Sequence, residues 1–322
     1  MIAALTMGSF VLQLLASGFG PQNPPIHSAP KPPEAPQVTA ANYRVYTPDG
    51  HAASIDDVVA AMANVDVVFV GEEHDDPGAH FLESDLLRRA NERYGRAVGA
   101  GQRPVTLSLE MFERDVQSVV DEYLSDLITE KHFLSSSRPW TRYATDYRPM
   151  VEYAREQRLP VVAANTPGRY ANRAARLGRE SLDALQGDAR QWLPPLPYGA
   201  PDPEYAEKFE KLMGGADPAS PHAPLHLIDA QVLWDAGMAY SVAQTLMRTP
   251  NGLVLHVNGG FHSEDHMGIP TQLARYRPGT RQLTVQVYSG RGFPNFDISK
   301  LGHLGDFIIL TDPALKPAVK AE

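Results

Sequence analysis

The chain has 322 residues, of which 43% are apolar and 21% are charged, so it can form a folded core and is neither a disordered nor a fibrous chain. Its 38 acidic and 29 basic residues give a net charge of −9, which argues against nucleic acid as the main partner. Without any cysteine, the chain cannot form a disulfide or a thiolate metal site, so a metal would need His, Asp, Glu, Tyr or Met as its ligands.

The first forty residues are expected to lie outside the fold. Residues 1–20 contain an uncharged apolar run followed by small residues, which is typical of an export signal, although no basic residue precedes the run. This run is too short for a transmembrane span. Residues 21–40 are rich in proline and predict an extended tether. A lipid anchor is not expected, because Phe19 stands where the lipid-bearing cysteine would be required.

Residues 41–322 are expected to form a single α/β domain. Short apolar runs predict strands that are buried on both faces, at residues 65–70, 105–109, 161–164, 253–257, 283–287 and 307–310. Helical patterns alternate with them, at residues 79–94, 115–128, 149–157, 169–177, 225–247 and 271–276. This alternation predicts a layered, mostly parallel sheet flanked by helices.

An insertion interrupts the alternation at residues 186–224. Two proline-rich patches, 194–203 and 218–224, enclose a helix-forming stretch. Because proline-rich segments cannot join the interior of a sheet, we expect a helical insertion that covers the edge formed by the carboxyl ends of the strands.

Polar side chains follow four of the predicted strands at the point where each strand ends. Glu72 and His74 follow the first strand, Glu110 the second, Asn165 the third and His262 the fourth. The carboxyl ends of parallel strands share one edge, and ligands bind there in open α/β sheets. We therefore expect these side chains to form one polar site.

Two further residues are candidates for this site. Asp235 falls in the middle of the apolar stripe of helix 225–247, and a buried carboxylate needs a partner or a place in the site. His266 lies four residues after His262, so a helix beginning there would put both imidazoles on one face. The nitrogen and oxygen ligands of the predicted site suit a divalent zinc, manganese or cobalt ion. The candidate metal ligands are Glu72, His74, Glu110, His262 and His266.

Six motifs carry a resemblance to a known family. They are VVFVGEEH (67–74), SLEMF (108–112), DYRP (146–149), ANTP (164–167), QVLWDAGMA (231–239) and GGFH (259–262). Together they resemble the ChaN family of haem-binding, iron-regulated proteins over residues 45–312. That family belongs to a wider group with the Tiki metalloproteases, TraB-type proteins and erythromycin esterases, which carry paired Gly-x-x-His elements, here at 71–74 and 259–262.

The resemblance implies a haem-binding protein of haem-iron acquisition, placed in the periplasm or at the outer membrane. It implies haem as the cofactor, a homodimer that forms on haem binding, and coordination of the haem by tyrosine. Tyr147 and Tyr143 are the candidate haem ligands, because Arg142 and Arg148 beside them would favour the tyrosinate that ferric iron prefers. The alternative function is a metal-dependent hydrolase, similar to a Tiki protease or an erythromycin esterase, so the sequence leaves open whether the chain is an enzyme.

Overall fold

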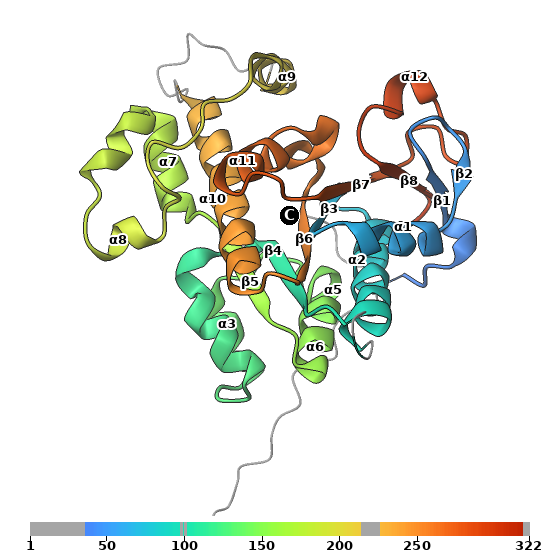
Figure 1. Cartoon of the computed structure of the whole chain (residues 1–322), viewed down its shortest axis with the longest axis horizontal. Helices are drawn as coiled ribbons and strands as arrows, with labels where there is room; N and C mark the ends of the chain where they lie inside the picture. Colours follow the sequence, from blue (N-terminus) through green and yellow to red (C-terminus); the bar gives the residue numbers. More distant parts are fainter. Residues whose placement is uncertain (1–35, 97–98, 100–101, 214–225, 318–322) are drawn as a thin grey trace, which may run out of the picture. The chain divides into compact units, whose positions relative to one another are not determined.

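The computed structural model describes residues 36–96, 99, 102–213 and 226–317. The predicted export signal, most of the predicted tether and residues 214–224 of the predicted insertion lie outside the described residues. In the described part, the strands form an eight-stranded sheet in the order β2-β1-β8-β7-β3-β6-β4-β5 (Figure 1). The strands are β1 (Tyr43–Tyr46), β2 (Ala52–Ala53), β3 (Val67–Glu72), β4 (Val105–Glu113), β5 (Val161–Asn165), β6 (Leu253–Gly259), β7 (Gln282–Ser289) and β8 (Phe307–Thr311).

The six predicted strands are confirmed as β3 to β8, and neighbouring strands among them pair in parallel. The sequence reading missed β1 and β2, which pair with each other and extend the sheet antiparallel to β8. Only Val45 of β1 is buried, so these short edge strands lack the continuous apolar run that identifies the others. The fold class is therefore the expected layered α/β architecture.

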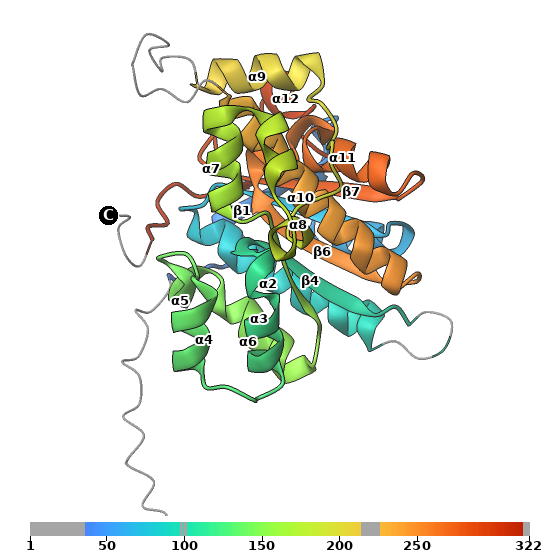
Figure 2. The same ribbon diagram turned by 90° about the vertical axis from the view of Figure 1, so that its left-hand side faces the viewer.

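Helices cover both faces of the sheet, as Figure 2 shows for α2, α3 and α6 on one side and α10 and α11 on the other. The predicted helices are confirmed within a few residues, whereas α1, α4, α5, α8 and α12 were missed. The helices are α1 (Ile55–Ala61), α2 (Pro77–Ala90), α3 (Gln117–Leu124), α4 (Glu130–Ser137), α5 (Tyr143–Asp146), α6 (Arg148–Gln157), α7 (Gly168–Leu177), α8 (Asp188–Gln191), α9 (Pro203–Met213), α10 (Leu227–Arg248), α11 (Ile269–Tyr276) and α12 (Ile298–Leu301).

The first four residues of the central strand β3, Val67 to Val70, are all apolar. Val68 and Val70 face the core formed with α1 and α2, while Val67 and Phe69 face the core formed with α10 and α11. All four side chains are fully buried, because alternate residues of a strand point to opposite faces and both faces are covered. The strand leads directly into the polar residues at its carboxyl end.

The described part of the insertion packs beside α7 and α10. Leu193, Tyr198 and Tyr205 are buried in a shared apolar cluster with these two helices. Tyr205 lies on α9, and its hydroxyl reaches Asp235 on α10, so the insertion contributes a side chain to the region beyond the strands.

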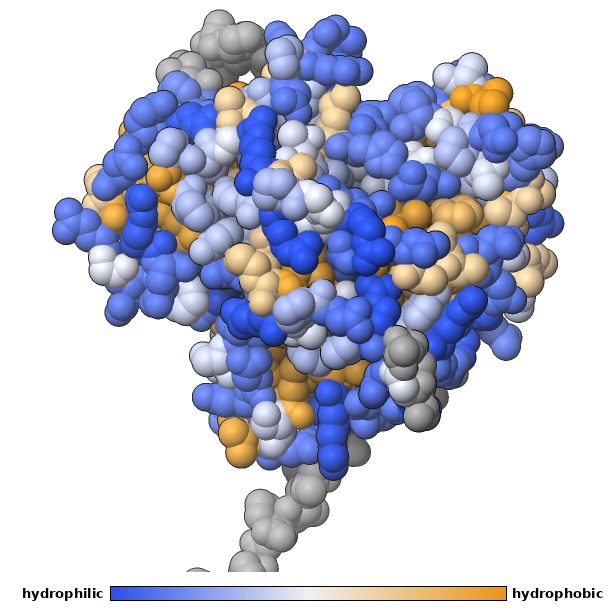
Figure 3. Space-filling model, in the orientation of Figure 1, coloured by the Kyte–Doolittle hydropathy of each residue, from blue (hydrophilic) through white to orange (hydrophobic). Residues whose placement is uncertain are grey.

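The outer surface in the view of Figure 1 is mixed in character. Hydrophilic side chains separate small patches of apolar ones, as the space-filling view shows (Figure 3). Within the described ranges, every helix is either too short or too polar to cross a bilayer.

Candidate functional site

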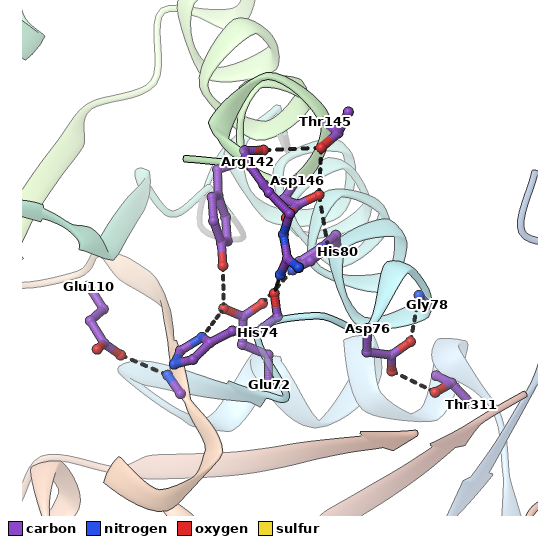
Figure 4. A network of polar contacts seen from close by, with 12 residues as sticks. Glu72, His74, Asp76, Gly78, His80, Glu110, Arg142, Thr145, Asp146 and Thr311 are labelled. Atoms are coloured by element: carbon purple, nitrogen blue, oxygen red, sulfur yellow. Dashed lines mark hydrogen bonds and ion pairs between the residues drawn. The ribbon is translucent and has the colours of Figure 1, made fainter. Parts of the chain in front are cut away.

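The first part of the site is centred on Glu72, the last residue of β3, whose carboxylate is fully buried (Figure 4). Its Oε1 atom accepts hydrogen bonds from Nδ1 of His74 at 2.8 Å and from the hydroxyl of Tyr147 at 2.7 Å. Its Oε2 atom lies 3.0 Å from Nε2 of His80. Burial raises the pKa of Glu72, but the close contacts with His74 and His80 outweigh burial and hold the pKa below its ordinary range.

His74 is the exposed member of this group, with 47% of its side chain accessible. The bond to Glu72 fixes Nδ1, so Nε2 is the nitrogen left for another partner. A Cβ atom on Gly259 would lie 2.8 Å from Nε2 and from Cε1, so the imidazole sits where only glycine leaves room for it. Burial disfavours the charged imidazole, but the hydrogen bond and the charge of Glu72 outweigh burial and raise the pKa of His74.

Two side chains of α2 complete the buried part of this group, and the sequence reading missed both. His80 links Glu72 to Asp146, whose Oδ1 lies 3.5 Å from Nδ1 of His80. Glu83 is fully buried, and neither of its side-chain oxygens has a donor among the described residues. Burial and the nearby charge of Glu72 raise the pKa of Glu83 well above its ordinary value, which favours the protonated form of Glu83 beside the carboxylate of Glu72. His80 and Glu83 are three residues apart, but only the packing of α2 against β3 brings them to Glu72.

The loop between β3 and α2 is held by a helix cap. The side chain of Asp76 accepts a hydrogen bond of 2.8 Å from the backbone N–H of Gly78, and Pro77 occupies the first position of α2. The same carboxylate accepts from the hydroxyl of Thr311 at 2.5 Å. Asp76 therefore anchors the loop that carries His74.

The second part of the site is centred on His262, which follows β6 and is buried. Its Nδ1 atom lies 2.6 Å from Oδ1 of Asp235, and its Nε2 atom lies 3.6 Å from Oε1 of Glu110. The other oxygen of Asp235 accepts a hydrogen bond of 2.7 Å from the hydroxyl of Tyr205. The amide of Gln231 lies within hydrogen-bond distance of both Tyr205 and His262.

The charges of this second part are coupled. Burial lowers the pKa of His262, but the carboxylates of Glu110 and Asp235 outweigh burial and raise the pKa to about 9. Burial raises the pKa of Asp235, although the contact with His262 opposes that effect. At neutral pH, His262 is therefore an imidazolium that balances the buried negative charge around it.

The two parts of the site meet at Gly259. Its backbone N–H donates a hydrogen bond of 2.7 Å to Oε2 of Glu110, and His74 packs against its α-carbon. Glu72, His74, Glu110 and His262 thus lie at the carboxyl ends of β3, β4 and β6. Glu110 lies inside β4, beside an irregularity in its pairing with β5, rather than after the strand, and Asp235 reaches His262 from α10.

Two predicted members of the site lie apart from these five. Asn165 ends β5 and is buried, and no hydrogen bond joins it to the side chains described above. His266 does not share a helix face with His262, because the chain forms two short 3₁₀ turns there and His266 has a φ of 58°. Its imidazole contacts Thr284 instead. Among the described residues, no group of three or more His, Asp or Glu side chains has the placement to hold a metal ion, so the predicted metal centre is not assembled.

Tyr147 and Tyr143 are the predicted haem ligands, chosen for the arginines beside them. Both side chains are buried, and the two arginines have carboxylate partners, Arg142 with Asp146 and Arg148 with Glu130. Burial and the charge of Glu72 raise the pKa of Tyr147, and burial raises the pKa of Tyr143. In this structure, neither tyrosine therefore presents a tyrosinate oxygen to a ligand.

The sequence matches the family described as "Haem-binding uptake, Tiki superfamily, ChaN" over residues 58–273. This range contains every residue of the two-part site and four of the six parallel strands. The chain belongs to this family. The resemblance of the six motifs to ChaN is thereby confirmed. No curated protein sequence matches the chain significantly.

Three solved structures are similar to this ChaN-family chain. The ChaN of Campylobacter jejuni, a structure described as showing cofacial haem binding, is 14% identical with a TM-score of 0.62, and the similarity covers 86% of this chain and 99% of that one. It shows that the two proteins share a fold. A mutant erythromycin esterase in its open conformation has 10% identity and a TM-score of 0.46, covering 84% of this chain and 97% of that one. The type III effector HopBA1 has 13% identity and a TM-score of 0.43, covering 80% and 93%.

Proposed function

We propose that this chain binds haem at the exposed imidazole of His74 and that it serves haem-iron acquisition as an exported protein, in the periplasm or at the outer membrane. Membership of the ChaN family supports haem as the ligand class. His74 is proposed as the haem-binding residue because of its position. Its side chain is half exposed at the carboxyl edge of the sheet, and its Nδ1 atom is hydrogen-bonded to the buried carboxylate of Glu72.

The surroundings of His74 would suit a residue that holds haem iron. Histidines that ligate metals characteristically donate their second ring N–H to a carboxylate, which fixes the ring and strengthens the ligating nitrogen as a base. Glu72 provides that carboxylate, and the 13 tyrosines of the chain, which are all described, are buried or half-buried. When bound, haem would supply an iron that accepts the lone pair of Nε2. The residues present therefore fit the group, with histidine in place of the tyrosine that the resemblance implied.

The surroundings of His74 provide support for a flat ligand. The indole of Trp140 lies edge-on to the imidazole, with ring centroids 4.9 Å apart. Arg142 donates a hydrogen bond to the carbonyl oxygen of His74 and forms an ion pair with Asp146, and these contacts hold the loop that carries His74 in place.

The half exposure of His74 also supports the proposed homodimer. A haem held by a side chain at the surface would keep much of its apolar face in water, and burial of that face against a second subunit would be favourable. We therefore propose that haem binding promotes pairing of two chains through this edge.

Hemin titration of the purified protein tests the proposal. We expect a Soret band typical of histidine ligation, and we expect His74→Ala to weaken hemin binding by at least about tenfold, because the iron loses its ligand. His51→Ala is the matched control, since Nδ1 of His51 also lies 2.8 Å from a carboxylate but the side chain is far more exposed and belongs to a different loop. Equal affinities for the wild type and the His74 variant would refute His74 as the ligand, and no Soret shift in any protein would refute haem binding.

The site gives no specific support to the hydrolase alternative. A histidine that acts as a general base must be neutral, whereas the pKa of about 9 keeps His262 protonated at neutral pH. His262 instead acts as a fixed positive charge between Asp235 and Glu110.

A further inference from the structure

A cavity of about 150 Å³ lies at the β5 edge of the sheet, away from the residues of the two-part site. The edge strand β5, helix α10 and the residue that follows α8 form its walls. Its lining includes two positively charged side chains, Arg114 and Arg248, the polar Ser241 and Gln244, and the apolar Val162 and Trp192.

Arg114 is the unusual member of this lining, because its guanidinium has only neutral partners. It donates to the hydroxyl of Ser241 at 2.7 Å and to the side-chain oxygen of Gln244 at 3.1 Å. Its Nε atom is buried and has no hydrogen-bond partner among the described residues. Burial lowers the pKa of Arg114 to about 10, a direction opposite to that found for arginines that have a carboxylate partner, such as Arg148.

The second arginine adds to this uncompensated charge. Arg248 is exposed at the end of α10, and the residues that line the cavity include no acidic side chain. A desolvated cation without a counterion is unfavourable, so an anion that entered the cavity would be stabilised by both guanidinium groups.

Arg103 shows how a buried arginine can have a purely structural role, unlike Arg114. Arg103 is also buried without a carboxylate in hydrogen-bond distance, but its guanidinium donates to the backbone oxygens of Met62, Val65 and Gly252, which ties three chain segments together. Arg114, in contrast, borders open space that a ligand can occupy.

We propose that this cavity binds a small aromatic carboxylate. The guanidinium of Arg114 and that of Arg248 would hold the carboxylate, because arginine matches the geometry of oxyanions. The volume of about 150 Å³ is the size of a cavity that accommodates a benzene ring, and Trp192 and Val162 provide an apolar wall for that ring. This site is independent of the haem site proposed at His74.

Calorimetric titration of the full chain with sodium benzoate tests this inference. We expect saturable 1:1 binding of benzoate and no binding of benzyl alcohol, which has a ring of the same size but no charge. Arg248→Gln should weaken benzoate binding by about tenfold, the effect of losing one charge-assisted contact. Arg93→Gln is the matched control, because Arg93 is also an exposed arginine at a helix end and does not line the cavity.

The outcomes decide the inference in either direction. Benzoate binding that is weakened in Arg248→Gln and unchanged in Arg93→Gln supports it. Absence of benzoate binding by the folded wild type, equal affinity in both variants, or equal affinity for benzyl alcohol would overturn it. Arg248 is exposed, so its replacement leaves the core intact, and a hemin titration of the same variants reports separately on the site at His74.

Discussion

Replacement of His262 by glutamine tests the charge balance of the site. In the folded protein, Asp235 and Glu110 flank this imidazole at 2.6 and 3.6 Å and raise its pKa from 6.5 to about 9. Glutamine keeps a donor beside Asp235 but carries no charge at any pH. The comparison of the two proteins therefore isolates the proton that His262 binds.

The pKa of about 9 predicts both the size and the sign of the effect. At 1.36 kcal/mol for each unit of pKa, the rise from 6.5 stabilises the folded state by about 3 kcal/mol. Below pH 6.5, His262 is protonated in both the folded and the unfolded chain, so the stabilisation is fully present. As the pH rises through about 9, the folded protein loses this proton and the stabilisation disappears.

Urea unfolding followed by circular dichroism, at pH values from 6 to 10, measures this effect. We expect the free energy of unfolding of the wild type to fall relative to that of His262→Gln by about 3 kcal/mol across this range. His74 also has a raised pKa and titrates in both proteins, and because the charge of His262 opposes that rise, the pKa of His74 should rise further in His262→Gln. Parallel pH profiles for the two proteins would show that His262 does not hold an additional proton in the folded state.

Three further predictions concern the neighbours of these residues. Glu72→Gln should weaken hemin binding about 10- to 100-fold in a Soret titration, because it removes the carboxylate that orients His74, and an unchanged affinity would contradict that role. Gly259→Ala should also weaken hemin binding while preserving the circular dichroism spectrum, because its φ of −57° suits alanine but the new Cβ would meet the His74 ring at 2.8 Å. Tyr205→Phe should lower the free energy of unfolding by about 2 kcal/mol, because the hydroxyl of Tyr205 donates to the carboxylate of Asp235. The control Tyr198→Phe should lower it by about 1 kcal/mol, because the hydroxyl of Tyr198 donates to a neutral carbonyl oxygen. Equal losses in the two variants would show that the charge of Asp235 contributes nothing.

The sequence by itself determined the strands of the central sheet and the edge at which the polar residues gather. The continuous apolar runs identify strands that are covered on both faces, as Val67 to Val70 of β3 are. The position of a residue after such a strand is also a local property, and the carboxyl ends of parallel strands meet at one edge. The sequence alone therefore predicts that Glu72, Glu110 and His262 gather at this edge.

Only the tertiary structure decided which of these side chains contact one another and in what charge state. His80, Glu83 and Tyr205 reach the site from helices, and their sequence positions do not reveal the strand or helix against which each one packs. The pKa values of Tyr147 and Arg114 also depend on residues that are distant in the sequence but close in the fold, because burial and nearby charged groups shift a pKa. Periodicity reports which residues of one element share a face, whereas the contacts between elements depend on packing between segments that lie far apart in the chain.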